Sequence, residues 1–439
     1  MPQYYFDPFG CVKNQVDAEN MMAQLNSAGW LSAQDAEGAD LIIVNSCGFI
    51  EDAKRESIDA VMEWRRLYPG KKILLAGCLA QRYSKELGES LPEADGFFGT
   101  DDITKITAAV NSLGLGGGEL GSGLLTGDRP LLSLPGSAYV KISEGCDNNC
   151  SYCAIPLIRG PLRCRAVQDI LDECRGLLAR GVKELCIIGQ DIGSYRSGDS
   201  GLPELLAAIS GLSGDFWLRL LYMHPDHFPL TVLDIMERDL RFLPYFDIPF
   251  QHASQGILSA MNRHGNAEAY LALVETIRSR LPRSVIRTTF LVGFPGETDA
   301  DFASLLGFQE KLRPDWLGCF SYSREEGTAA YAMPRRVPKK TALARKQEVE
   351  ERQMRITEEN MDRFVNQSLD VLLEERFDGD SDNAEHEDLW LGRLYCHAPE
   401  VDGAAVIAGT MSGTEKAGDV LSCKVIARRG FDLEVRLIS

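Results

Sequence analysis

Short apolar runs alternate with longer amphipathic stretches over residues 1–111. The runs fall at residues 4–6, 41–44 and 73–76, and each has the length and composition of a buried strand. Each run is followed by a stretch with the spacing of an amphipathic helix. Strands that alternate with helices along a chain pair in parallel. The pattern therefore predicts an N-terminal parallel α/β domain.

A change of composition separates this region from the next one. Residues 112–136 are rich in glycine, with Gly116-Gly117-Gly118 and Gly121-Ser122-Gly123 close together. Such a sequence favours a flexible connection over a packed element. We therefore expect a linker at residues 112–136.

Six strand-like runs alternate with helix-like stretches up to residue 323, and a charged helix follows from residue 339 to residue 364. This order predicts an α/β domain over residues 137–364, folded as a (β/α)6 partial barrel. Its active site would lie at the carboxyl ends of the strands, where the βα loops gather. The predicted strands span residues 139–143, 184–188, 217–222, 245–248, 285–292 and 316–321.

The remaining residues, 365–439, consist of short β-like runs. Turn signals separate them at Asp378-Gly379, Asp402-Gly403 and Ala417-Gly418. This pattern predicts a small antiparallel β-barrel. A chain of 439 residues also exceeds what one hydrophobic core normally supports. We therefore expect a multidomain α/β protein.

Charge and targeting signals narrow the range of partners. The formal net charge is −18, which opposes unassisted binding to a phosphate backbone because such binding depends on Lys and Arg. A basic partner fits better than a nucleic acid. The first residues lack the basic and apolar regions of a signal peptide, and no segment approaches a membrane-spanning length. We therefore expect a cytoplasmic protein without a membrane partner.

The 12 cysteines raise the question of metal binding, because thiols in a reducing cytosol stay reduced or bind metal. Cys146, Cys150 and Cys153 form a CxxxCxxC sequence directly after the first strand of the predicted barrel. Three closely spaced thiolates can hold three irons of a four-iron cluster and leave the fourth iron open. That iron can bind the amino and carboxylate groups of S-adenosylmethionine (SAM), whose reductive cleavage yields a 5′-deoxyadenosyl radical.

A zinc knuckle is the alternative for this triad, with a fourth ligand such as Cys164. Structural zinc sites prefer paired CxxC knuckles, whereas this triad opens a βα-repeat domain at the end where ligands bind. The iron–sulfur interpretation is therefore favoured.

With this triad, the middle of the chain resembles the radical SAM superfamily. Gly189-Gln190-Asp191 and the sequence from Thr289 to Thr298 also match the pattern of that family, and both lie at strand carboxyl ends. The resemblance implies contacts to the adenine, to the methionine moiety and to the cofactor through the backbone. Ordinary βα turns are the alternative for the two loops. The residues implied as SAM contacts are Tyr152, Gln190, Asp191, Gly293, Phe294 and Gly296.

A second set of three cysteines lies in the N-terminal domain. Cys11, Cys47 and Cys78 each come just after one of its predicted strands. The loops that follow the strands of a parallel sheet converge on one edge, so the three thiols would meet there. Three unrelated buried thiols are the alternative, because a cysteine without a metal behaves as a small hydrophobic residue. Their occurrence in three consecutive βα loops favours a second cluster.

With both triads, the chain resembles the radical SAM methylthiotransferases from end to end. Members of that family combine a cluster-binding domain, a radical domain and a small barrel of the TRAM type. The resemblance implies two four-iron, four-sulfur (4Fe–4S) clusters, of which the second carries the sulfur. It also implies that one SAM methylates this sulfur and that a second SAM supplies the radical that removes a substrate hydrogen. An electron donor such as flavodoxin is expected.

Charge indicates which branch of this family the chain is similar to. The family modifies either an adenosine beside a tRNA anticodon or an aspartate, at its β-carbon, of small-subunit ribosomal protein S twelve. Residues 365–439 hold 15 acidic and 7 basic residues, whereas a tRNA-binding module would need the opposite sign. Ribosomal proteins are highly basic, and complementary charge would orient their docking. Glu144, just before Gly145-Cys146, also resembles the ribosomal-protein branch.

We therefore expect a methylthiotransferase that acts on ribosomal protein S twelve. The acidic segment 378–388 would help to hold this substrate, although a solvated hairpin without a partner is the alternative. A tRNA methylthiotransferase and a non-catalytic iron–sulfur carrier are the competing functions. His224 and His252 both follow strands and could line the cavity, although a lone histidine is more often a hydrogen-bonded structural residue than a catalyst. The candidate substrate-binding residues are Asp378, Asp380, Asp382 and Glu385.

Overall fold

The computed structural model describes residues 1–115, 128–377, 389–407 and 413–438. The chain divides into two compact units that do not follow the order of the sequence. Unit 1 consists of Met1–Leu132, Lys141–Arg165 and Ser323–Ala332, and unit 2 consists of Ser133–Val140, Ala166–Tyr322 and Met333–Ser439. Within the described residues, no helix combines the length and apolar character needed to span a membrane.

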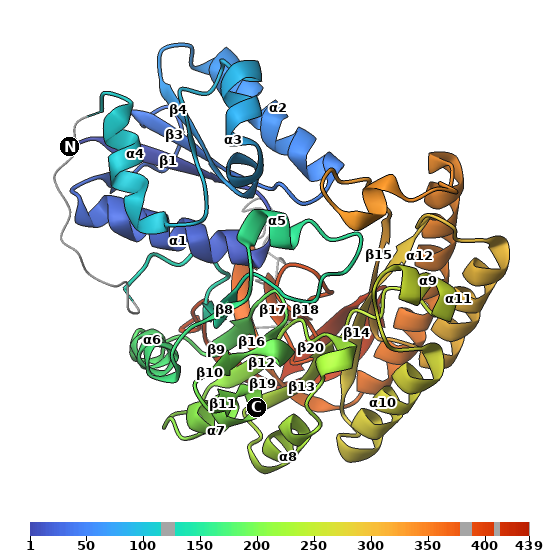
Figure 1. Cartoon of the computed structure of the whole chain (residues 1–439). Helices are drawn as coiled ribbons and strands as arrows, with labels where there is room; N and C mark the ends of the chain where they lie inside the picture. Colours follow the sequence, from blue (N-terminus) through green and yellow to red (C-terminus); the bar gives the residue numbers. More distant parts are fainter. Residues whose placement is uncertain (116–127, 378–388, 408–412, 439) are drawn as a thin grey trace, which may run out of the picture. The chain divides into compact units, whose positions relative to one another are not determined.

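Unit 1 is built on a five-stranded parallel sheet in the order β2-β1-β3-β4-β5, with helices on both faces (Figure 1). The three apolar runs of the sequence lie in β1, β3 and β4, which confirms the predicted parallel α/β fold. The strands are β1 (Gln3–Pro8), β2 (Leu31–Ser32), β3 (Leu41–Ser46), β4 (Lys72–Gly77) and β5 (Gly96–Phe98). The helices are α1 (Val12–Ser27), α2 (Glu51–Leu67), α3 (Cys78–Ser90), η1 (Ile103–Lys105) and α4 (Ile106–Ser112).

Strand β3 shows why these runs are continuously apolar. Leu41 and Ile43 pack into a core with residues of α1 and α4, whereas Ile42 and Val44 pack into a second core with residues of α2 and α3. Successive side chains of a strand point to opposite faces, and both faces of this sheet are covered. Every position of the strand is therefore buried, as is typical of parallel sheets.

The remaining parts of unit 1 surround the CxxxCxxC loop. A short hairpin of β7 (Ser143–Glu144) and β8 (Arg163–Cys164) encloses this loop and the helix α5 (Ile155–Arg159). The segment Ser323–Ala332 ends in the 3-10 helix η4 (Ala329–Ala332), and the Ala330 backbone N–H donates to the Ser151 carbonyl at 2.8 Å.

Unit 2 contains a six-stranded sheet in the order β15-β14-β13-β12-β9-β6, in which the pairs from β9 to β15 are parallel. This is the predicted succession of βα units. Strands β6, β12 and β13 differ from the prediction only at their ends. The strands are β6 (Ser137–Lys141, of which residues 137–140 belong to unit 2), β9 (Glu184–Ile188), β12 (Trp217–Leu220), β13 (Phe242–Asp247), β14 (Val285–Val292) and β15 (Trp316–Ser321).

Helices cover the outer face of this sheet, and α10, α11 and α12 lie along its β14–β15 side (Figure 1). The charged stretch of the sequence forms α12, which continues into one 3-10 turn. The helices are α6 (Val167–Ala179), α7 (Leu202–Ser210), α8 (Thr231–Arg238), α9 (Gln255–Ala260), α10 (Ala267–Arg280), α11 (Asp299–Leu312) and α12 (Lys339–Met361). Smaller elements are η2 (Ile192–Ser194), η3 (Pro225–His227), η5 (Asp362–Phe364) and the hairpin of β10 (Arg196–Ser197) and β11 (Ser200–Gly201).

The C-terminal residues form a closed barrel in the order β16-β17-β18-β20-β19. The predicted barrel is confirmed, but it is not purely antiparallel, because β18 and β20 pair in parallel. The strands are β16 (Ser368–Phe377), β17 (Leu389–Arg393), β18 (Ala405–Ile407), β19 (Val420–Arg429) and β20 (Asp432–Leu437). Barrel residues such as Val371, Trp390 and Val435 share one apolar core with Tyr245, Val285 and Trp316 of the large sheet.

Candidate active site and cluster-binding cysteines

Cys11, Cys47 and Cys78 follow three neighbouring strands of the unit 1 sheet. Cys11 immediately precedes α1, Cys47 follows β3, and Cys78 is the first residue of α3, directly after β4. Because β1, β3 and β4 are adjacent and parallel, the three loops lie at one edge of the sheet. Cys11 interacts electrostatically with both other thiols. The structure therefore brings this predicted triad together.

Two glycines let the loops that carry Cys47 and Cys78 pack closely. A Cβ atom on Gly48 would lie 2.7 Å from the Cys78 carbonyl oxygen. Gly77 has a φ of +97°, and a Cβ there would lie 2.7 Å from the Ser46 carbonyl oxygen. Only a residue without a side chain fits this spacing and this left-handed conformation.

The three thiols differ in exposure: Cys11 is exposed, Cys47 is half-buried and Cys78 is buried. Burial raises the pKa of the Cys78 thiol to about 12, and the positive charge of Arg159 opposes this rise. Burial also raises the pKa of Cys47. A metal held by these two thiols would have to displace their protons, since the thiolate is the ligand.

The second triad lies on the loop between β7 and α5, where Cys146, Cys150 and Cys153 are all half-buried. The backbone of this loop is tightly folded. The Cys153 N–H donates to the Cys150 carbonyl at 3.0 Å, and the Cys146 N–H donates to the Gly160 carbonyl at 3.2 Å. The three thiols are thus held on one short turn.

Among the described residues, no group of three or more His, Cys, Asp or Glu side chains is arranged to hold a single metal ion. A four-iron cluster with one open iron would take three thiolates, each on a different iron atom. Each triad supplies three thiols, and none of the 12 cysteines forms a disulfide. Cys164, the alternative zinc ligand, lies opposite Ser143 in the β7–β8 hairpin.

Gln190 and Asp191 follow β9 in unit 2, and both are buried. The carboxylate of Asp191 accepts hydrogen bonds from the backbone N–H groups of His224 (3.0 Å) and Gly193 (3.1 Å) and from the Ser194 hydroxyl (2.6 Å). Asp191 therefore ties the loop after β9 to the loop after β12. This arrangement shows Asp191 organising the strand ends, and Gln190 extends from the same loop.

The turn that follows β14 is shaped by Glu297. Its Oε2 accepts from the backbone N–H groups of Gly293 (2.6 Å) and Phe294 (3.2 Å), and its Oε1 accepts from the Arg345 guanidinium at 2.7 Å. The Phe294 ring is fully buried and packs edge-on against Tyr322. Any approach of a cofactor to this turn would therefore involve the backbone of Phe294 and not its ring.

Helix α12 also constrains this turn. Gly293 has a φ of +75°, and a Cβ atom there would lie 2.5 Å from the Cβ of Ala342 in α12. Gly296 also has a positive φ, of +89°. The glycines are thus required by the fold itself, because a side chain at either position would meet a strained backbone and, at Gly293, helix α12.

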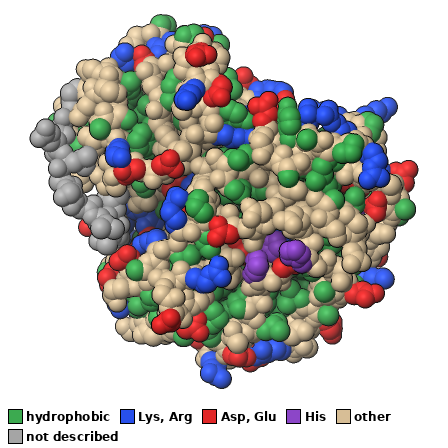
Figure 2. All heavy atoms as spheres, viewed as in Figure 1, with side chains coloured by type: hydrophobic (Ala, Val, Ile, Leu, Met, Phe, Trp, Pro, Cys, Tyr) green, Lys and Arg blue, Asp and Glu red, His purple; other side chains and the backbone are tan. Residues whose placement is uncertain are grey.

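His224 and His252 each accept a hydrogen bond from a backbone N–H two residues further on. Nδ1 of His224 accepts from the Asp226 N–H, and Nδ1 of His252 accepts from the Ser254 N–H. Burial lowers the pKa of His224 to about 2 and that of His252 to about 4, so both rings are neutral at pH 7. The His224 ring lies 5.3 Å from that of His227, and histidine side chains gather at one place on the surface in Figure 2.

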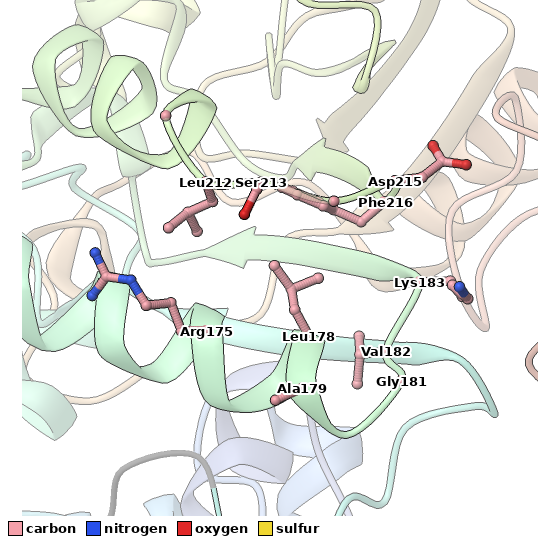
Figure 3. Close-up of a pocket in the computed structure, with 12 residues that line it drawn as sticks. Arg175, Leu178, Ala179, Gly181, Val182, Lys183, Leu212, Ser213, Asp215 and Phe216 are labelled. Carbon is pink, nitrogen blue, oxygen red and sulfur yellow. The ribbon is translucent and has the colours of Figure 1, made fainter.

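A cavity of about 540 Å³ lies at the opposite end of the strands. It is formed by the end of α6 and by the loops that precede β9 and β12, with Leu178, Lys183 and Phe216 in its wall (Figure 3). Active sites of parallel α/β sheets lie at the carboxyl ends of the strands. This cavity is therefore not part of the candidate site. The candidate substrate residues Asp378, Asp380, Asp382 and Glu385 lie outside the described residues.

Comparison with known proteins finds matches along almost the whole chain. Three family models match it: Uncharacterized protein family UPF0004 at residues 3–99, the Radical SAM superfamily at residues 140–308 and the TRAM domain at residues 365–438. The protein named "Ribosomal protein uS12 methylthiotransferase RimO" from Treponema denticola is 45% identical, over 98% of this chain and 99% of its own length. The proteins of the same name from Syntrophomonas wolfei and Aquifex aeolicus are each 38% identical over at least 95% of both chains.

The chain belongs to the RimO family. It is thus a radical SAM methylthiotransferase, which confirms the predicted enzyme class and excludes the non-catalytic iron–sulfur carrier. The radical SAM part requires SAM and a 4Fe–4S cluster, as predicted.

Solved structures are similar to this RimO family member in fold. The radical SAM methyltransferase TsrM from Kitasatospora setae has a TM-score of 0.57 at 15% identity, over 75% of this chain and 77% of that chain. The cobalamin-dependent SAM radical enzyme OxsB has a TM-score of 0.50 at 12% identity, over 80% of this chain and 56% of that chain. These likenesses concern the fold alone.

The roles of three residues that shape the loops of this RimO family member were not predicted from the sequence. Glu297 and Arg345 hold the turn after β14, but they are 48 residues apart in the sequence. Arg159, beside Cys78, was also not singled out, because its partners Asn14 and Asp17 are more than 140 positions away. No local pattern could indicate these pairs.

Proposed function

We propose that the chain attaches a methylthio group to the β-carbon of an aspartate of ribosomal protein uS12. The observation that carries this proposal is the end-to-end match to relatives named as uS12 methylthiotransferases, at 45% identity in one case. The acidic charge of residues 365–439 supports a basic protein substrate over tRNA. On this proposal the enzyme acts in the cytoplasm.

The protein's own residues would divide the chemistry between two sites. Cys146, Cys150 and Cys153 would hold the cluster that binds SAM, and Cys11, Cys47 and Cys78 would hold a second 4Fe–4S cluster. When bound, these groups supply a 5′-deoxyadenosyl radical that takes the substrate hydrogen and a sulfur that is methylated by another SAM.

The remaining candidates would bind and orient the reactants. Tyr152, Gln190 and Asp191 would contact SAM. The turn held by Glu297 would present the backbone of Gly293 to Gly296 to SAM. The rings of His224 and His252 are neutral at pH 7, and no general base is needed when a radical removes the hydrogen.

The acidic segment 378–388 would attract the basic substrate. Long-range attraction between opposite charges raises the rate of association and orients the partner. Replacing Asp378, Asp380, Asp382 and Glu385 by the corresponding amides should raise KM for uS12 and leave the rate of SAM cleavage without substrate unchanged. An electron donor such as flavodoxin would reduce the SAM-binding cluster in the cell.

The test is a competition between substrates. The anaerobically reconstituted full-length chain is incubated with SAM, a reductant, and either uS12 or unmodified tRNA, and the products are analysed by mass spectrometry. We expect one methylthio group on the uS12 aspartate and none on tRNA, with both S-adenosylhomocysteine and 5′-deoxyadenosine formed. Modified tRNA together with unmodified uS12 would show the tRNA methylthiotransferase instead. The Cys146→Ala variant serves as the inactive control.

A further inference from the structure

Arg159 connects the two cysteine triads of unit 1. It is the last residue of α5, six positions after Cys153. Its side chain is 98% buried, and its Nη2 lies 3.1 Å from the Sγ of Cys78. Arg159 lies in the segment of the CxxxCxxC triad. Its guanidinium group thus donates a hydrogen bond to Cys78, a candidate cluster ligand of the other triad.

The position of Arg159 is fixed by further contacts. Its Nη1 donates to Asp17 at 2.7 Å and to Glu144 at 2.9 Å, and its Nη2 also donates to the side-chain oxygen of Asn14 at 2.5 Å. Asn14 in turn donates to the Ser46 carbonyl, one residue before Cys47. The guanidinium plane is therefore held by charge-assisted bonds on both sides.

Apolar packing supports the same arrangement. Ala154 and Ile158 of α5 form a small buried cluster with Cys78. The approach of α5 to α3 therefore brings Arg159 beside Cys78, and hydrogen bonds alone do not have to hold it there.

The charges around Arg159 balance before any cluster binds. Arg159 and Lys141 face Asp17 and Glu144, and Lys141 forms ion pairs with both carboxylates. Three ligating thiolates would add negative charge that this set does not compensate. Arg159 is the cation in contact with Cys78, and its charge also acts on Cys47.

We infer that Arg159 is a positioning residue that sets the reduction potential of a cluster bound by Cys11, Cys47 and Cys78. This inference rests on the second cluster of the proposed function. A hydrogen bond to a ligating sulfur and a nearby positive charge stabilise the reduced, more negative cluster and so raise its reduction potential. Arg159 supplies the hydrogen bond and the positive charge. It also belongs to the segment that carries the SAM-binding triad, so that segment influences the reduction potential of the other cluster.

The test isolates the second cluster in the full-length chain. Cys146, Cys150 and Cys153 are replaced by Ala, so that iron in the reconstituted protein belongs to the other triad. Arg159→Gln, Arg159→Lys and Asp17→Asn are then introduced separately. The reduction potential is measured by redox titration followed by electron paramagnetic resonance, and iron retention is measured against a chelator. Arg66→Gln is the matched control, because Arg66 is exposed and pairs only with Glu63 among its described contacts.

The two charge changes should have opposite effects. Arg159→Gln removes a cation and should lower the ratio of reduced to oxidised cluster at a fixed potential at least tenfold, which is about 59 mV for a one-electron couple. Asp17→Asn removes an anion beside the same cysteine and should raise that ratio. Arg159→Lys should fall between wild type and Arg159→Gln, because a lysine keeps the charge but not the fork of donors. Arg66→Gln should change nothing.

If Arg159 and Asp17 only stabilise the fold, their substitution should affect the reduction potential differently. If Arg159→Gln and Asp17→Asn shift the potential in the same direction, or if Arg159→Gln leaves it unchanged, the inference is wrong. In the reciprocal background, with Cys11, Cys47 and Cys78 replaced by Ala, Arg159→Gln should leave the remaining cluster unaffected, and an equal shift there would also overturn it. A protein that holds no iron in the first background would instead refute the second cluster and with it the proposed function as stated.

Discussion

Glu184 provides a quantitative test of how the barrel is attached to the large sheet of unit 2. Its carboxylate is fully buried and accepts from Arg219 (2.6 Å), Arg393 (2.5 Å) and the Ser137 hydroxyl (2.9 Å). Arg393 belongs to β17 of the barrel and also pairs with Glu374 of β16, whereas Glu184 and Arg219 belong to the sheet. Glu184→Gln keeps the size of the side chain and removes its charge.

Two estimates of the unfolding free energy lost on Glu184→Gln agree. Removing one partner of a buried ion pair leaves an uncompensated charge and costs about 3–5 kcal/mol. Burial alone would raise the pKa of Glu184, but Arg393 and Arg219 outweigh this effect and hold the pKa at about 2, against an ordinary value of 4.5. At 1.36 kcal/mol per pKa unit, this difference corresponds to about 3 kcal/mol. We therefore expect Glu184→Gln to lower the free energy of unfolding by about 3 kcal/mol at pH 7.

The pH dependence follows from the sign of this shift. Because the pKa is lower in the folded state, the carboxylate stabilises the fold fully above pH 4.5, and this contribution is lost as the pH falls toward 2. The difference between wild type and Glu184→Gln should therefore be smaller at pH 3.5 than at pH 7.

Urea unfolding of the metal-free full-length chain, followed by tryptophan fluorescence and circular dichroism, measures both quantities. Glu348→Gln is the matched control: Glu348 pairs with Arg352 on the exposed side of α12, and its loss should cost less than about 0.5 kcal/mol. A Glu184→Gln variant within about 1 kcal/mol of wild type at pH 7 would refute the reasoning, and so would a difference that grows at pH 3.5.

Four further substitutions test the candidate site, and a fifth, Gly307→Ala, serves as a control. Cys146→Ala should abolish reductive cleavage of SAM, whereas Cys47→Ala should retain it and lose methylthio transfer, as product analysis by chromatography would show; equal loss of both activities would contradict separate roles for the triads. Arg345→Met should weaken SAM binding about tenfold in a calorimetric titration, because the turn after β14 loses a buried partner; unchanged affinity would mean that this turn does not bind SAM. Gly293→Ala should lower stability by about 1–3 kcal/mol through strain and overlap with α12, whereas Gly307→Ala, in the open interior of α11, should raise it by about 0.5–1 kcal/mol; thermal unfolding that shows the reverse order would contradict this account.

The sequence predicts the sheets well because their residues follow short periods. In β3 every position is apolar since both faces are covered, and the run at residues 41–44 indicates this directly. The position of Cys11, Cys47 and Cys78 after successive strands also predicts their convergence, because adjacency of parallel strands places their following loops side by side.

The compact units could not be predicted in the same way. The CxxxCxxC loop follows the first strand of the large sheet in the sequence, yet residues 141–165 pack with the N-terminal residues in unit 1. The contacts responsible join Lys141 and Arg159 to Asp17. Single ion pairs between distant positions leave no periodic signal. The parallel pairing of β18 with β20 could not be predicted from the sequence either. Short strands with similar patterns do not specify which strand they pair with.

Long-range contacts of the same kind also attach the C-terminal barrel to the large sheet of unit 2. In sequence the barrel looks like a separate module joined by a helix, but the residues between β17 and β18 form hydrogen bonds with side chains of the large sheet of unit 2. The Trp316 indole donates to the Cys396 carbonyl at 2.7 Å, the Tyr245 hydroxyl donates to Asp402 at 2.6 Å, and Arg219 donates to the Tyr395 carbonyl at 3.0 Å. A partner that docks on the barrel would therefore be placed relative to the strands β12 to β15 by buried side chains. On the proposed function, these contacts would attach the acidic module that attracts uS12 to the sheet whose strand ends carry Gln190 and Gly293, two of the proposed SAM contacts.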